Sequence, residues 1–116
     1  MLRIDENENI YLSRGDSADI EFLLTSSDDE DLNGTHVIFS MGRGLRNQDE
    51  PIWIKEYTVD EEGIVTLRID PEDTANLPDG IYYYSMTVVF GENVITPLED
   101  RHFEVGKKVP YGKDTD

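Results

Sequence analysis

The chain has 116 residues, with 26 acidic and 10 basic side chains and a formal net charge of −16 at pH 7. This length fits a single domain, and the negative charge argues against nucleic acid backbones and anionic membrane surfaces as partners. The absence of cysteine excludes disulfide bonds, thiolate chemistry and cysteine-based zinc sites.

The first third of the chain predicts three strands separated by polar turns. Residues 10–13 form a short strand, and residues 18–25 form a second strand in which apolar and polar side chains alternate. Residues 26–34 contain too many charges and turn formers for anything but a loop. Residues 35–41 then form a third strand. The side chains expected to face inward in the second and third strands are Ala18, Ile20, Phe22, Leu24, Val37, Phe39 and Met41.

The middle of the chain predicts a hairpin that starts at a sheet edge. Pro51 lacks a backbone donor, so the strand over residues 52–58 is expected to begin at an edge. Residues 59–63 form the turn, and residues 64–69 form the return strand. The inward set of the return strand is expected to be Val65, Leu67 and Ile69.

The stretch over residues 70–90 predicts a corner that leads into a core strand. A proline and two acids suit the first turn of a helix at residues 71–73, and a Leu-Pro pair ends that turn at residues 77–78. Gly80 then turns the chain, and the strand presents Tyr82 on a large apolar face. A tyrosine at the start of such a strand, after a corner carrying Leu77, is the arrangement of a tyrosine corner in an immunoglobulin-like sandwich.

The C-terminal part predicts a last strand and a tail. Residues 91–93 form a hairpin turn, and the strand over residues 94–105 is expected to have a bulge or kink at Pro97 and the acidic pair that follows it. Residues 106–116 have no pattern that packs and are interpreted as a flexible tail. We therefore expect an all-β, immunoglobulin-like antiparallel β-sandwich of about seven strands over residues 1–105.

One acidic loop resembles part of a calcium site. Asp29, Asp31 and Asn33 match the first half of an EF-hand loop, with oxygen ligands at alternate positions before Gly34, and Asp28 beside them is a further candidate ligand. The closing glutamate is missing, because Ser40 stands at its position. The sequence therefore predicts a solvated loop, with weak calcium binding as the alternative, and no metal or cofactor otherwise.

Other short motifs carry little chemistry. The sequence Arg14-Gly15-Asp16 matches the tripeptide that integrins bind, but the needs of a tight turn are sufficient to explain it. The two histidines, His36 and His102, lie in predicted strands with no metal-binding pattern around them. No nucleophile motif of the Gly-x-Ser-x-Gly type occurs, so we expect no enzymatic activity.

Aromatic side chains provide the candidate interface residues. Trp53 and Tyr57 share one side of their predicted strand, and Tyr83 lies opposite the core face of its own strand. Exposed tryptophan and tyrosine supply much of the energy of protein interfaces. For Trp53 the pattern leaves two alternatives open, because both faces of its strand are apolar: Trp53 belongs to the interface, or it belongs to the core while Ile52 and Ile54 point outward.

The order of these motifs resembles a known family. The elements that carry the resemblance lie at residues 10–16, 32–39, 63–67, 70–84, 94–98 and 103–105. The most specific is the corner, a Pro-Glu-Asp-Thr-Ala turn followed by Leu-Pro and then Gly-x-Tyr-Tyr-Tyr. The chain resembles, over roughly residues 9–105, the small immunoglobulin-like domain of Gram-positive phages and prophages, found at the N-terminus of baseplate upper proteins and as a free-standing virion protein.

The resemblance implies a non-enzymatic virion module of the baseplate, tail or capsid that acts through protein-protein contacts. Its expected partners are other virion proteins, with a basic surface matching the acidic charge, and a homo-oligomer stays open. The resemblance implies that the chain is located in the virion, assembled in the bacterial cytoplasm, which fits the absence of cysteine. No apolar run approaches the roughly 18 residues that span a bilayer, and the acidic N-terminus lacks a signal-peptide pattern. The alternative is a carbohydrate- or host-surface-binding adhesion module.

Overall fold

The computed structural model describes residues 2–26, 31–44 and 50–107, which form a chain of strands with one short helix. The elements in chain order are β1 (Leu2–Ile4), β2 (Ile10–Ser13), β3 (Ala18–Leu23), β4 (His36–Gly42), β5 (Trp53–Thr58), β6 (Ile64–Ile69), α1 (Pro71–Thr74), β7 (Gly80–Phe90) and β8 (Asn93–Gly106). The predicted all-β class is confirmed.

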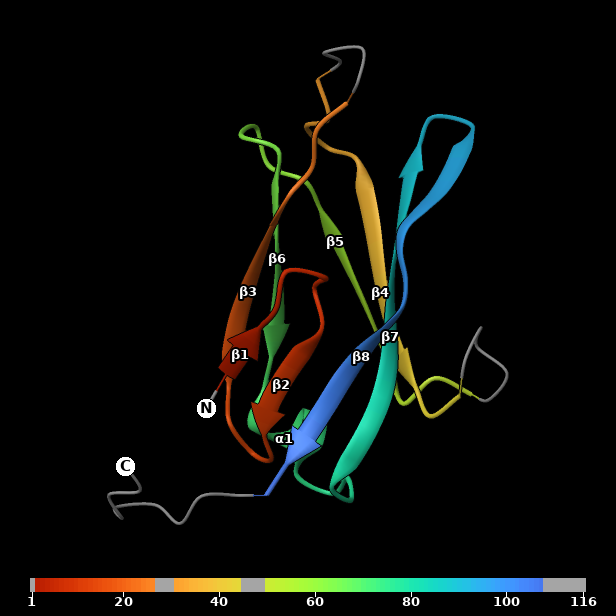
Figure 1. Cartoon of the computed structure of the whole chain (residues 1–116). Helices are drawn as coiled ribbons and strands as arrows, with labels where there is room; N and C mark the ends of the chain where they lie inside the picture. The colour runs from red at the N-terminus through yellow and green to blue at the C-terminus, as the bar shows by residue number, and fades with distance from the viewer. Residues whose placement is uncertain (1, 27–30, 45–49, 108–116) are drawn as a thin grey trace.

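The strands form two sheets that face each other in a sandwich-like arrangement (Figure 1). The larger sheet has the order β1-β2-β8-β7-β4-β5, and the smaller one consists of β3 and β6. β5 lies at an edge of the larger sheet, as the proline before it predicted. The two sheets together fit an open half-barrel rather than a sandwich closed on every side.

The sheets enclose one apolar core that follows the predicted alternation. Val37, Phe39 and Met41 of β4 are fully buried, and Val65, Leu67 and Ile69 of β6 are buried opposite them. In β3 the alternation holds less fully, because Ala18 and Ile20 are buried whereas Phe22, and Leu24 just after the strand, are only half-buried. The core therefore thins toward the end of β3.

The predicted tyrosine corner is present. The hydroxyl of Tyr82 donates a hydrogen bond to the carbonyl oxygen of Pro78 at 2.7 Å, and both Tyr82 and Leu77 are buried. Two reciprocal hydrogen bonds cap the N-terminus of the helical turn before it. The Asp70 N–H donates to the carboxylate of Asp73, and the Asp73 N–H donates to the Asp70 carbonyl. Gly80 adopts a φ of 153°, a conformation that side chains rarely allow, as the chain enters β7.

β8 is irregular at the predicted place and longer than predicted. Its pairing with β7 shifts register between Tyr84 and Val88, and Asp100 adopts a positive φ of 53°. Ser85, on β7 opposite this irregularity, is buried, and its hydroxyl accepts the Asp100 N–H at 3.0 Å. The sandwich includes Gly106, which is buried and pairs with Ser13, so the expected boundary at residue 105 is one residue short. The remainder of the predicted tail, residues 108–116, lies outside the described residues.

Two features of the larger sheet were not predicted. The described chain has eight strands rather than about seven, because Leu2–Ile4 pairs with β2 as an additional edge strand. In addition, β2 and β8 are parallel, so the sheet is mixed and not purely antiparallel. The pairing of β2 with β8 joins segments far apart in the sequence, which a local alternation pattern does not specify, and the three residues of β1 are too few to form such a pattern.

Candidate binding surface

The outer face of β1, β2 and β8 carries a row of polar and aromatic side chains. Tyr11 alternates with buried Ile10 and Leu12, so it points away from the core. Arg3 is its cross-strand partner on β1, and Glu104 is its partner on β8. The guanidinium carbon of Arg3 lies 4.6 Å from the centre of the Tyr11 ring, in cation–π contact.

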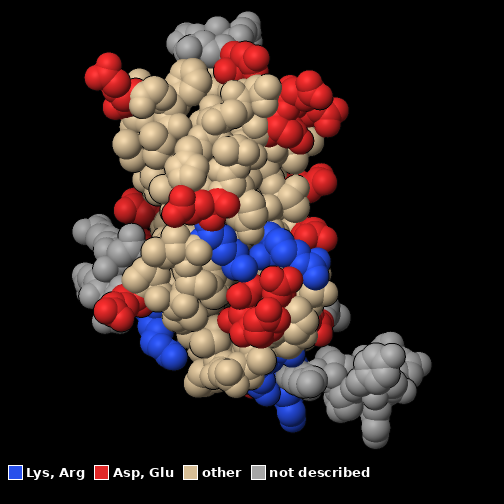
Figure 2. All heavy atoms as spheres, turned by 180° about the vertical axis from the view of Figure 1, so that it is seen from behind, with Lys and Arg blue, Asp and Glu red and all other residues tan. Residues whose placement is uncertain are grey.

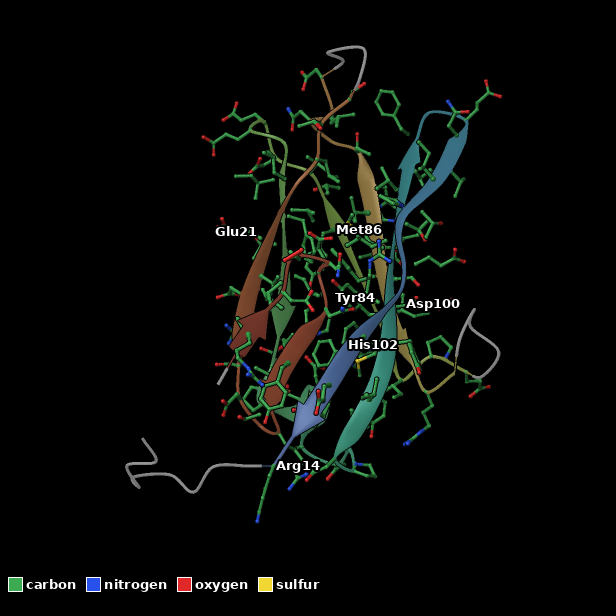
Figure 3. All side chains as sticks on the ribbon, viewed as in Figure 1. Arg14, Glu21, Tyr84, Met86, Asp100 and His102 are labelled. Carbon is green, nitrogen blue, oxygen red and sulfur yellow. The ribbon has the colours of Figure 1, made fainter. Side chains whose placement is uncertain are left out.

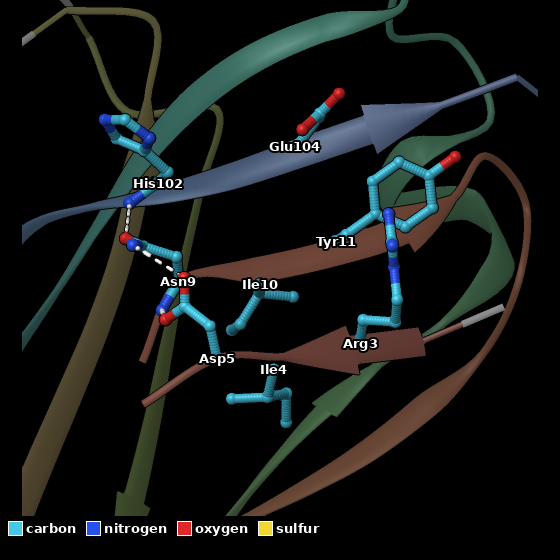
Figure 4. Close-up of a pocket in the computed structure, with 8 residues that line it drawn as sticks. All are labelled: Arg3, Ile4, Asp5, Asn9, Ile10, Tyr11, His102 and Glu104. Atoms are coloured by element: carbon cyan, nitrogen blue, oxygen red, sulfur yellow. Dashed lines mark hydrogen bonds between the residues drawn. The ribbon is translucent and has the colours of Figure 1, made fainter. Parts of the chain in front are cut away.

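A hydrogen-bonded group closes one end of this row (Figure 4). The carboxylate of Asp5 accepts the backbone N–H groups of Asn7 at 2.8 Å and Asn9 at 3.0 Å, and the Asn9 side-chain amide at 3.1 Å. The side-chain oxygen of Asn9 accepts the backbone N–H of His102 at 2.9 Å. The hydrogen bonds from Asn9 hold the pKa of Asp5 below its ordinary value of 3.8.

Together these side chains line an open depression of about 590 Å³. The lining residues are Arg3, Ile4, Asp5, Asn9, Ile10, Tyr11, His102 and Glu104. The set offers a guanidinium, two carboxylates, an amide and an imidazole around the phenol ring of Tyr11. Such a mixture can bind a hydroxylated or peptide-like ligand. The shift of Asp5 runs downward, which suits a hydrogen-bond acceptor rather than a general acid.

The expected interface aromatics divide between the two faces of the larger sheet. Tyr83 lies half-buried on the outer face, as predicted, with its ring centre 5.4 Å from that of His102 in an edge-on contact. Trp53 and Tyr57 instead face the core, which corrects their assignment to an exposed interface patch. The Trp53 ring packs edge-on against Phe103 with ring centres 6.2 Å apart, and the Tyr57 ring lies 6.0 Å from Phe39.

The alternative interpretation of Trp53 is therefore the correct one, with one exception. Ile54 points outward and is 55% exposed, as that alternative requires. Ile52, however, packs partly against the core. It precedes the regular strand, which begins at Trp53, so the alternation of β5 does not extend to it.

The acidic charge is spread over the surface while several basic side chains are already engaged. Seen from behind, acidic side chains border most of the outline and basic ones are concentrated in its lower half (Figure 2). Arg14 forms an ion pair with Asp79, and Lys55 contacts Asp73 at 2.8 Å. Arg68 bridges Asp19 at 3.2 Å and Asp70 at 2.9 Å. These pairs leave a large acidic excess toward solvent.

The remaining candidates from the sequence carry no assembled site. Asp28 and Asp29 lie outside the described residues, whereas the Asp31 carboxylate accepts the Asn33 N–H at 2.9 Å in a local turn. Weak calcium binding there stays a prediction. His36 contacts Glu56 at 2.9 Å on the surface. Within residues 2–26, 31–44 and 50–107, no cluster of three or more histidine or acidic side chains is arranged to hold a metal ion.

The Arg14-Gly15-Asp16 segment forms the tight turn that the structural interpretation predicts. Gly15 has a φ of 83°, and the Asp16 N–H donates to the Ser13 carbonyl at 3.0 Å. The Gly15 N–H donates to the Thr74 hydroxyl at 2.8 Å, which ties this turn to α1. Across the described ranges, no helix has the length and apolar character needed to cross a membrane.

No protein-family model matches the chain, and no curated protein matches it significantly.

Proposed function

We propose that this chain is a non-enzymatic structural module of a phage or prophage virion, acting through protein-protein contacts in the baseplate, tail or capsid. The observation that carries the proposal is the corner at residues 70–84, whose sequence resembles the virion immunoglobulin-like domain. The Tyr82–Pro78 hydrogen bond supports the resemblance, because the corner has the geometry that the motif implies.

The charge of the chain supports a mode of binding. A body with a formal charge of −16 is steered toward a basic surface, and the attraction between exposed charges weakens as salt rises. The proposed partner is therefore another virion protein with Lys- and Arg-rich contact residues. Nucleic acid and anionic membranes are not proposed as partners, because their phosphates repel this surface.

The test is mass spectrometry of purified particles from a bacterium that encodes the chain and releases phage. The proposal predicts that the chain is present in washed particles and that rising salt extracts it. A chain that remains in the soluble lysate and never sediments with particles would contradict the virion assignment. Retention that does not change between low and high salt would contradict the electrostatic part alone.

A second candidate function, binding of carbohydrate or a host surface, is favoured by one specific observation. Tyr11 and His102 lie in the depression of about 590 Å³ beside two carboxylates and an amide, a combination of ring and polar groups suited to sugars. Trp53, one of the candidate interface aromatics, is turned toward the core and does not contribute to this surface. A glycan array with the wild-type chain and Tyr11→Ala tests the alternative. Binding that Tyr11→Ala abolishes would support it.

A further inference from the structure

The sandwich is open along one side, where two strand edges have no partner strand in the described chain. β3 pairs with β6 on one edge only. β8 pairs with β2 from Phe103 to Gly106, so from Asn93 to Arg101 its only partner strand among the described residues is β7. A groove of about 350 Å³ lies between these two edges.

The groove is predominantly apolar. Its floor is formed by the buried side chains of Ile20, Met86 and Leu98, and Leu23 at its rim is 67% exposed. Figure 3 labels Met86 and Glu21, which come from β7 and β3 respectively. The other lining residues are Ile4, Glu8, Phe22, Leu24 and Pro97. An apolar, uncovered cleft beside free strand edges is the kind of surface that an added strand covers.

The backbone of β3 is oriented to accept such a strand. The Leu24 N–H donates to the Gly63 carbonyl at 2.8 Å, in register with the antiparallel pairing of β3 and β6. Hydrogen bonding in an antiparallel pair alternates from residue to residue, so the N–H and C=O groups of Glu21 and Leu23 point away from β6. These groups can pair with a strand laid along the free edge.

The charge of the groove selects the partner. Glu8 and Glu21 line it, and no Lys or Arg is among its lining residues. An extended segment with basic side chains would find opposite charge at this rim, whereas an acidic one would be repelled. Alternating apolar side chains on the same segment would fill the groove, because one face of an added strand points inward.

We propose that this groove binds an extended segment of another protein, which adds to the free edge of β3, packs alternate apolar side chains against Met86 and Leu98, and carries flanking Lys or Arg residues. Strand addition of this kind draws affinity from main-chain hydrogen bonds and specificity from the side-chain pockets. The proposal deepens the proposed function, since it names the contact through which a virion partner would dock.

The absence of cysteine in the chain allows a direct test by disulfide trapping. The probe is a short synthetic peptide of alternating valine and threonine, with two lysines at each end and one central cysteine. Leu23→Cys places a thiol at the groove rim, and Ile54→Cys places one on β5, an edge strand outside the groove with a similarly exposed aliphatic side chain. We expect the yield of the disulfide between the peptide and Leu23→Cys to exceed the yield with Ile54→Cys by about tenfold or more. Equal trapping at both positions would overturn the assignment to the groove.

Charge reversal tests the electrostatic selection without a disulfide. Glu21→Lys is expected to raise the Kd for the same peptide without its cysteine by about three- to tenfold. Glu50→Lys makes the same change in net charge at an exposed position before β5 and should leave the Kd unchanged. Equal weakening by both variants would show that only net charge matters and would overturn selection at the groove.

The two proposals fail in distinguishable ways. If the chain is present in particles but both Leu23→Cys and Glu21→Lys behave as their controls, the groove is not the docking site and the virion function stands. If the peptide binds the groove but the chain is never found in particles, the groove stands and the virion function fails. If cross-links join the groove to a second copy of the chain, the occupant is this protein itself, which contradicts a heterologous partner.

Discussion

Replacing Tyr82 by phenylalanine removes one hydroxyl from the tyrosine corner and leaves the ring in place. The hydroxyl donates to the Pro78 carbonyl at 2.7 Å, and Tyr82 is 4% exposed. A hydrogen bond of this kind contributes about 0.5–1.5 kcal/mol net. Pro78 is exposed, so its carbonyl can regain a water molecule, and we expect Tyr82→Phe to lower the free energy of unfolding by about 1 kcal/mol. For a domain of this size the melting temperature should fall by about 4 °C.

Urea denaturation followed by tryptophan fluorescence measures this change, since Trp53 packs against the core. The matched control is Tyr83→Phe, the same chemical change on the next residue, whose side chain lies on the outer face. We expect the control to lie within about 0.5 kcal/mol of the wild type. If Tyr82→Phe and Tyr83→Phe were equally stable, the corner hydrogen bond would not hold the crossing between the sheets, and the resemblance would lose its structural support.

Three further variants test local features of the structure. Gly106→Ala should lower the free energy of unfolding by about 1–3 kcal/mol, because a Cβ at this position would collide with the Tyr11 ring. Gly42→Ala, at the end of β4, is the control, because a Cβ there meets no other atom. Asp73→Ala should lower the free energy of unfolding by about 1–2 kcal/mol, because the Asp70 N–H loses its carboxylate acceptor and Lys55 loses its ion pair. Glu72→Ala, at an exposed position in the same turn, should lower it by less, and thermal melting compares the two variants. The stabilising contribution of Asp5 should be complete above its unfolded pKa and be lost as the pH falls through its lower folded pKa; carboxyl NMR titration that placed the folded pKa above 3.8 would contradict the hydrogen bonding to Asn9.

Local patterns predicted the parts of the fold that depend on local interactions. The alternation in β4 and β6 gave the correct inward faces, and the residues from Pro71 to Tyr82 gave the capped turn and the corner. The kink in β8 followed from a proline and charges within an otherwise regular strand. In each case a few neighbouring residues carry the physical cause.

Two features of the larger sheet were missed. β1 has only three residues, all exposed, which is too short for a recognisable pattern, and the parallel pairing of β2 with β8 joins residues about ninety positions apart. The binding surface was missed for the same reason, because register alone brings Arg3, Tyr11 and Glu104 together. Its one sequence signal was Tyr11, an aromatic on the polar side of its strand. The orientation of Trp53 stayed open because apolar residues occupy both faces of β5.

Hydrogen exchange of the chain, measured free and assembled in particles, shows whether the groove is the docking surface, since it reports where the backbone becomes covered. We expect slower exchange in assembled particles at residues 19–23 of β3 and 93–99 of β8, with the exchange of β5 unchanged. Slower exchange confined to β1 and β2 around Tyr11 would contradict docking at the groove and would favour the outer face as the working surface.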